Sequence, residues 1–105
     1  GCFMKMSQKR EGATLTLGFE GRLDALSAPE FDSILKNSLE DIDLLILDFS
    51  DLHYVSSAGL RVILLAQKEM NARNGKMIVK DVSLGVREVL EMTGFAGILT
   101  IESAL

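Results

Sequence analysis

At residues 44–49 the chain reads Leu44-Leu45-Ile46-Leu47-Asp48-Phe49, an almost unbroken apolar run. Such a run is typical of a central strand that is covered on both faces. A short polar stretch from Ser50 to Ser57 follows it. An amphipathic helix is then predicted from Leu60, Ile63, Leu64 and Met70, which recur at helical spacing with Gln67 among them. A strand that runs through a short loop into a helix predicts an α/β domain.

Further strands are predicted on both sides of this unit. Residues 14–21 alternate apolar and polar side chains, which is the period of a strand with one buried face. A faint strand precedes them near residues 5–9, and residues 77–82 and 98–101 resemble two more. Alternation of strands and helices with short connections implies right-handed parallel crossovers. The sheet is expected to carry its helices on one face or on both.

The first helix is predicted near residues 28–39, with a capping box at its start. Ser27 is expected to accept a hydrogen bond from a free backbone N–H, and Glu30 to reach back, with Pro29 in the first turn. Asn74-Gly75 is expected to end the second helix. A third helix, marked by Val86, Val89 and Leu90, closes at Gly94.

Length and composition indicate one globular domain over residues 1–105, without a linker. The hydrophobic fraction of 48% is too high for a disordered chain. No apolar run approaches the roughly 18 residues of a membrane span, so membrane insertion is not expected. Eleven Lys and Arg against fifteen Asp and Glu leave a formal charge of −4. A nucleic-acid partner is not expected, because such binders usually have the opposite charge balance.

Cysteine and histidine are too few for a zinc cluster, since the chain holds one of each, Cys2 and His53. No metal or cofactor is expected, and a lone cysteine fits a cytoplasmic protein. Gly1-Cys2-Phe3 precede Met4, and we expect them to be a remnant of cloning, so Cys2 is given no role.

Two consecutive hydroxyls, Ser56 and Ser57, precede the second helix, where backbone N–H groups are unpaired and the helix dipole is positive. Gly59 in the first turn leaves room for the close approach of a partner. A phosphate on a serine here would be stabilised by the dipole and by any free N–H. Serines before a helix are also ordinary N-caps. Local chemistry therefore leaves open whether this is a cap or a regulatory site.

Several segments in order resemble the STAS domain family. They are Gly21-Arg22-Leu23-Asp24, Ala28-Pro29-Glu30-Phe31, the strand that reaches Asp48, and Tyr54-Val55-Ser56-Ser57-Ala58-Gly59-Leu60. The resemblance runs from about residue 12 to the C-terminus and is closest to bacterial anti-sigma factor antagonists. It implies a single α/β domain with a mixed β-sheet of four to five strands and three or four helices packed on it.

The resemblance also implies a protein partner and a switch. In this family an anti-sigma factor that is a serine kinase phosphorylates a serine at the start of the second helix, which ends binding, and a phosphatase resets the switch. Aligned through Gly59 and Leu60, that serine falls on Ser57. The aspartate of the common family motif falls on Ser56, and its second serine on Ala58. A homodimer is a further candidate assembly.

Asp24 and Arg61 are expected to contact the partner, together with Ser56, Ser57, Ala58 and Gly59. The ordinary alternatives are a turn carboxylate for Asp24 and a solvated surface cation for Arg61. A phosphate adds a charge of about −1.5 to −2. If an interface covers Ser57, a dianion buried there without a cationic partner would be strongly disfavoured, and Asp24 on the same edge would add repulsion.

Catalysis is not expected. Asp51, His53 and Ser57 supply the residue types of a hydrolase triad, but they crowd into one short segment, whereas a triad draws on separate elements. The Gly-x-Ser-x-Gly elbow and the nucleotide-binding glycine motifs are missing from the sequence. Two alternatives to a switched antagonist remain: an unswitched STAS subunit of a larger signalling or lipid-transport assembly, and a small serine-dependent hydrolase.

Overall fold

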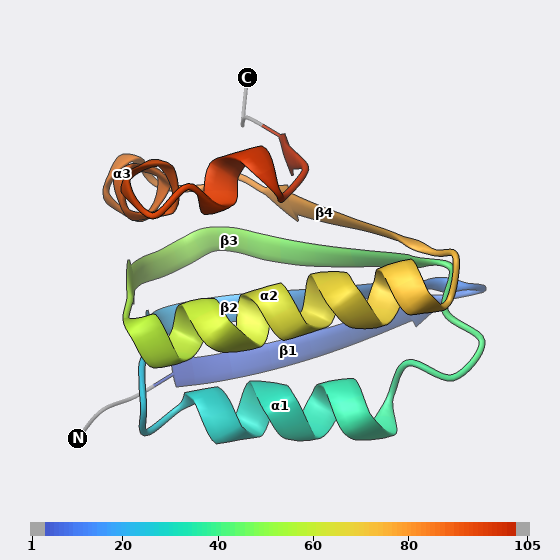
Figure 1. Ribbon diagram of the computed structural model, residues 1–105. Coiled ribbons are helices and arrows are strands. Elements are labelled where there is room, and N and C mark those ends of the chain that lie inside the picture. The colour runs from blue at the N-terminus through green and yellow to red at the C-terminus, as the bar shows by residue number, and fades with distance from the viewer. Residues whose placement is uncertain (1–3, 103–105) are drawn as a thin grey trace.

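In the part of the chain that the structure describes, five strands, three α-helices and one 3₁₀ turn make up the fold (Figure 1). The computed structural model describes residues 4–102. Gly1, Cys2 and Phe3, expected above to be a cloning remnant, lie outside the described residues. The elements in chain order are β1 (Met4–Glu11), β2 (Thr14–Leu23), α1 (Ala28–Asn37), β3 (Leu44–Val55), α2 (Ser57–Ala72), β4 (Lys76–Lys80), α3 (Leu84–Met92), η1 (Phe95–Gly97) and β5 (Ile101–Glu102).

The strands form one mixed sheet in the order β1-β2-β3-β4-β5. β1 pairs antiparallel with β2 through the tight turn at Gly12, whose φ is +61°. The pairs β2–β3, β3–β4 and β4–β5 are parallel. The predicted α/β domain with parallel crossovers and a mixed sheet is therefore confirmed. The faint strand near residues 5–9 is the antiparallel edge strand β1.

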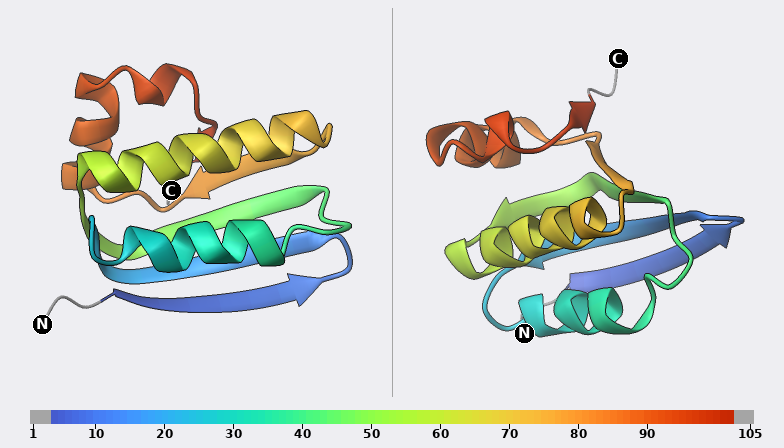
Figure 2. Two further views of the ribbon diagram at one scale, coloured as in Figure 1. Left: turned by 60° about the horizontal axis from the view of Figure 1, so that its bottom comes forward. Right: turned by 45° about the vertical axis from the view of Figure 1, so that its right-hand side comes forward.

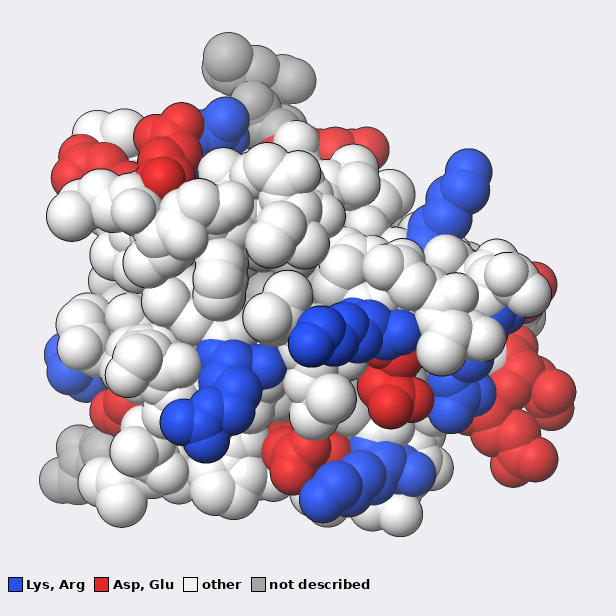
Figure 3. Space-filling model, viewed as in Figure 1, with Lys and Arg blue, Asp and Glu red and all other residues white. Residues whose placement is uncertain are grey.

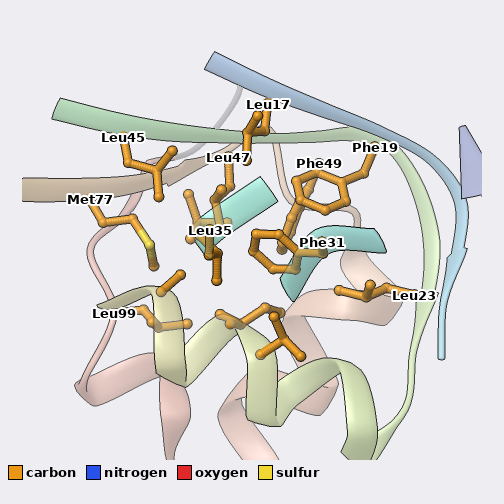
Figure 4. Close-up of a cluster of buried hydrophobic side chains, with 14 of the residues drawn as sticks. Leu17, Phe19, Leu23, Phe31, Leu35, Leu45, Leu47, Phe49, Met77 and Leu99 are labelled. Carbon is orange, nitrogen blue, oxygen red and sulfur yellow. The ribbon is translucent and has the colours of Figure 1, made fainter. Parts of the chain in front are cut away.

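The core lies between one face of the sheet and the helices (Figure 4). Leu45, Leu47 and Phe49 of β3 point toward the helices and are fully buried. The ring of Phe19 on β2 contacts the rings of Phe31 and Phe49 edge to face, with centroids 4.9 and 5.1 Å apart. Such aromatic pairs add to the stabilisation from burial alone.

The opposite face of the sheet is not covered by a helix among the described residues. Leu44, Ile46 and Asp48 alternate with the buried residues of β3 and are only half-buried. The prediction that this strand is covered on both faces is therefore wrong. On the open face, Ile46 of β3 lies directly opposite Ile78 of β4. Apolar cross-strand neighbours stabilise each other, so the open face also carries apolar residues and the run in the sequence is almost unbroken.

Helices α1 and α2 lie side by side across the sheet (Figures 1 and 2). Val86 and Leu90 of α3 join the same core. Within the described part of the chain, no helix has the length and apolar composition needed to cross a bilayer. The described part of the molecule is thus a sheet with one face packed by helices, with loops and helix ends at its edges.

The predicted capping box at Ser27 is wrong. The Ser27 hydroxyl caps no helical N–H; it donates to the Arg22 carbonyl at 2.7 Å and accepts from the Asp24 backbone N–H at 2.9 Å. The cause is local backbone geometry, because Ser27 has the right-handed helical conformation instead of the extended one that an N-cap needs. The helix itself ends at Asn37, two residues before the predicted end.

Two strand boundaries also differ from the prediction. β3 continues through the polar stretch to Val55, because residues 51–55 pair with the end of β2 across two irregularities of the register. The predicted last strand at residues 98–101 begins later, at Ile101 of β5, because the N–H groups of Ile98 and Leu99 both donate to the Phe95 carbonyl in a turn. The ends predicted at Asn74 and Gly94 are confirmed by positive φ angles of 60° and 80°.

Candidate functional site at the C-terminal edge of the sheet

The loops that leave the C-terminal ends of β2, β3 and β4 meet at one edge of the molecule, on the left of Figure 1. Two hydrogen bonds connect neighbouring segments there. The Ser56 N–H donates to the Leu23 carbonyl at 2.9 Å, and the Ser83 hydroxyl donates to the Leu52 carbonyl at 3.3 Å. This is the edge at which functional loops gather in parallel α/β sheets.

The two serines at the start of α2 have different surroundings. Ser56 is the N-cap, with an extended backbone and a side-chain oxygen that accepts from the Gly59 N–H at 3.3 Å. Ser57 is the first helical residue; it is exposed, and its hydroxyl makes no hydrogen bond within residues 4–102. One serine is therefore the cap, and the other leaves a free hydroxyl at the positive end of the helix.

Ser56→Ala is expected to lower the free energy of unfolding by about 0.5–1 kcal/mol, because it removes the cap of α2. Ser57→Ala is the matched control and should leave stability unchanged, since its hydroxyl bonds nothing in the described structure. Urea unfolding followed by circular dichroism measures both. Equal losses for the two variants would contradict the assignment of Ser56 as the cap.

Gly59 is buried where α2 meets the end of β2. A Cβ at this position would lie 2.7 Å from the Leu23 carbonyl oxygen and 2.8 Å from the Leu23 Cγ. The sequence suggested that this glycine lets a partner approach. The close approach that the structure contains is to Leu23 of the same chain, and it sets where the start of α2 sits.

Asp24 lies at the same edge, in the loop after β2, and its side chain is 19% exposed. Burial raises the pKa of this carboxyl, but hydrogen bonds from the N–H groups of Leu26 and Ser27 and from the Ser27 hydroxyl lower it. The guanidinium of Arg22, 3.7 Å from Oδ2, lowers the pKa further. The net shift is below the ordinary value of 3.8, so Asp24 is ionised at neutral pH.

A lowered pKa in the folded state means that the ionised carboxylate stabilises the fold. This stabilisation is complete above the ordinary pKa of 3.8 and is lost as the pH falls through the lower folded value. The difference in free energy of unfolding between the wild type and Asp24→Asn should therefore be constant near neutral pH and shrink in acid. Urea titrations across the acid range measure it, and a difference independent of pH would contradict this account.

Arg22 connects Asp24 to the end of β3. Its guanidinium lies over the Tyr54 ring, 4.1 Å from the centroid. Arg22 and Tyr54 are also paired in register across β2 and β3. Sequence analysis assigned no role to the Tyr54 side chain, and in the structure its ring contacts the cation that neighbours Asp24.

Ala58 and Arg61 line a groove of about 440 Å³ between α1 and α2. Charged side chains of both signs are interspersed over these two helices (Figure 3). A separate hollow of about 340 Å³ lies by Lys5, Gly18 and Asp48, and none of the predicted site residues lines it. The groove is therefore the depression that belongs to the predicted site.

Among residues 4–102, three large apolar side chains are exposed at this edge. Leu26 after β2 is 75% exposed, Leu84 after β4 is 74% exposed, and Tyr54 at the end of β3 is 41% exposed. Sequence reasoning missed Leu26 and Leu84. The available signal was that Leu84 falls outside the spacing of Val86, Val89 and Leu90. Exposed apolar side chains that share an edge are typical of a surface that binds another protein.

A comparison with protein families covers nearly the whole chain. The family described as the STAS domain matches residues 5–105. The chain belongs to the STAS domain family. This confirms the resemblance expected from the sequence, and residues 4–102 form a single fold with five strands and three α-helices.

Relatives of this STAS domain carry related names. It is 28% identical over 102 residues to the anti-sigma factor antagonist BtrV of Bordetella bronchiseptica, covering 96% of this chain and 88% of the relative. An antagonist from Mycobacterium paratuberculosis has a TM-score of 0.83 at 16% identity, over 94% of this chain and 85% of that one. The phosphorylated form of SpoIIAA from Bacillus has a TM-score of 0.78 at 18% identity, over 96% and 92%.

The three residues of the hydrolase alternative do not form a triad in the described structure of this STAS domain. Asp51 and His53 lie on β3 and Ser57 on α2, and all three side chains are exposed. No hydrogen bond joins any two of them in the part of the chain that the structure describes. A nucleophile needs a base in hydrogen-bond reach, and the base an orienting group.

Proposed function

We propose that this STAS domain is an anti-sigma factor antagonist. It binds an anti-sigma factor that is also a serine kinase, and phosphorylation of Ser57 by that kinase ends the binding. The observation that carries the proposal is a free, exposed Ser57 hydroxyl on a fixed helix start. That hydroxyl shares its edge with the exposed apolar side chains of Leu26, Tyr54 and Leu84.

The edge has the properties of a binding surface for a folded partner. Leu26 and Leu84 offer apolar contact area that a partner can remove from water. The start of α2 is held by the Ser56 cap and by the packing of Gly59 on Leu23. The same edge carries Asp24, Ser56, Ser57 and Ala58, which we propose as contacts of the partner.

Phosphorylation would act on this interface through local electrostatics. While Ser57 is exposed to water, a phosphate of charge about −1.5 to −2 on it would be stabilised by the positive end of the α2 dipole. Once a partner covers it, the same dianion loses its hydration, and the ionised Asp24 carboxylate lies on the same edge. Release therefore needs no change of fold.

The names of the relatives support the class of partner. BtrV is named an anti-sigma factor antagonist, and SpoIIAA is a relative in fold whose phosphorylated form has been solved. By this proposal the domain is a binding module without catalysis of its own, working in the cytoplasm, and a serine phosphatase restores the unmodified Ser57. A homodimer is not needed for the switch.

The test is a titration of the purified domain with each serine-kinase anti-sigma factor encoded in its source genome, with and without ATP. The proposal expects one of these proteins to form a complex that dissociates as Ser57 becomes phosphorylated. A complex that persists with Ser57 unmodified would favour the unswitched interaction subunit instead. Failure of every candidate to bind would overturn the proposal.

A further inference from the structure

The groove between α1 and α2 has an apolar floor and charged banks. It is about 440 Å³ in volume and is lined by Ala25, Ala28, Pro29, Asp32, Ala58, Arg61 and Val62. Ala28 and Val62 are buried in its floor. The small alanine side chains on both helices keep the groove open, which leaves room for an aliphatic side chain from another protein.

The two banks of the groove carry opposite charges that form no ion pair with each other among the described residues. Asp32 lies on α1, and its Oδ2 forms an ion pair with the Nζ of Lys36 at 3.1 Å. Its Oδ1 is buried and has no hydrogen-bond donor among the described residues. Arg61 stands exposed on α2 and makes no ion pair within residues 4–102. Asp32 therefore retains acceptor capacity that Lys36 does not use, and a buried carboxylate oxygen without a donor is unusual.

The groove is continuous with the edge that carries Ser57. Ala58 directly follows Ser57 on α2, and Arg61 lies one helical turn further on. On the other bank, Ala25 directly precedes the exposed Leu26. A partner that covers the Ser57 hydroxyl therefore reaches the groove without leaving the surface.

We propose that this groove takes a segment of the anti-sigma partner that inserts one aliphatic side chain between the helices. The segment places a Lys or Arg on Asp32 and an Asp or Glu on Arg61. The opposite charges of the two banks fix the direction in which the segment lies. This inference rests on the proposed function and adds to it the chemistry of the bound segment.

Charge-neutral variants test the groove against matched controls. Asp32→Asn and Arg61→Gln each remove one groove charge. Glu30→Gln and Lys68→Gln remove the same charges from exposed positions on the same two helices that do not line the groove. Isothermal titration with the serine-kinase anti-sigma factor that binds the wild type measures the affinity of each variant. Circular dichroism confirms that each variant is folded at the temperature of the titration.

The groove variants are expected to bind about 10-fold or more weakly, and the controls within about twofold of the wild type. Affinity that is unchanged in all four variants overturns the groove and leaves the proposed function standing. An equal loss in groove variants and controls also overturns it, because the effect is then one of net charge. If no such anti-sigma factor binds the wild type, the proposed function fails, and the groove with it.

Discussion

Ser57→Asp is expected to weaken binding to the anti-sigma factor by about 100-fold or more, since a charge buried without a partner commonly costs several kcal/mol. Ser57→Ala should bind within about threefold of the wild type, because the hydroxyl makes no hydrogen bond in the described structure and is a small neutral group. Asp24 increases the effect, because its carboxylate is ionised and lies on the same edge. Isothermal titration measures both affinities.

The control for this prediction is Ser33→Asp. It adds the same charge at an exposed position of α1, away from the edge that carries Ser57. Its affinity should stay within about twofold of the wild type, because an exposed and distant charge is screened. Equal affinities for Ser57→Asp and Ser57→Ala would show that no partner covers Ser57.

Gly59→Ala is expected to lower the free energy of unfolding by about 1–3 kcal/mol, although alanine normally favours a helix over glycine. The added Cβ would meet the Leu23 carbonyl oxygen at 2.7 Å and the Leu23 Cγ at 2.8 Å. The carbonyl cannot move freely, because it accepts the Ser56 N–H that ties α2 to β2. A loss of this size lowers the melting temperature by about 4–8 °C for each kcal/mol in a domain of this length.

Gly85→Ala is the matched control, a glycine in helix α3 whose added Cβ would have no heavy atom within 4 Å. Here alanine should raise the free energy of unfolding by about 0.5–1 kcal/mol, because only the helix preference acts. Thermal unfolding of the two variants gives shifts of opposite sign. A stabilised Gly59→Ala would contradict the tight packing of α2 on β2.

The order of strands and helices could be predicted from hydrophobic periodicity, because each element buries one face at its own spacing. What periodicity could not locate is the end of β3. Residues 50–55 are mostly polar, yet they extend the strand because β2 supplies a backbone partner for them. Ser27 shows the same limit. Its sequence fits a capping box, but a contact five residues back, to the Arg22 carbonyl, decides its side-chain direction.

In the candidate site, the sequence predicts two hydroxyls at a helix start, but the structure is needed to assign Ser56 as the cap and to leave the Ser57 hydroxyl without a hydrogen bond among the described residues. The requirement for glycine at position 59 could not be predicted from the sequence, since the close contact is with Leu23, far away in the chain. Leu26 and Leu84 were missed for a related reason. Apolar residues usually indicate burial, and apart from the helical spacing of Leu84 nothing in the sequence marks these two as lying outside the core.

The most direct test of a covered and switchable Ser57 is to mix the domain with its anti-sigma factor and Mg·ATP. The state of Ser57 is then followed by peptide mass spectrometry, and the amount of complex by gel filtration. The account predicts a single phosphoryl group on Ser57 and loss of the complex in step with its appearance. A phosphoryl group on another residue, or a phosphorylated Ser57 that stays in the complex, would contradict it.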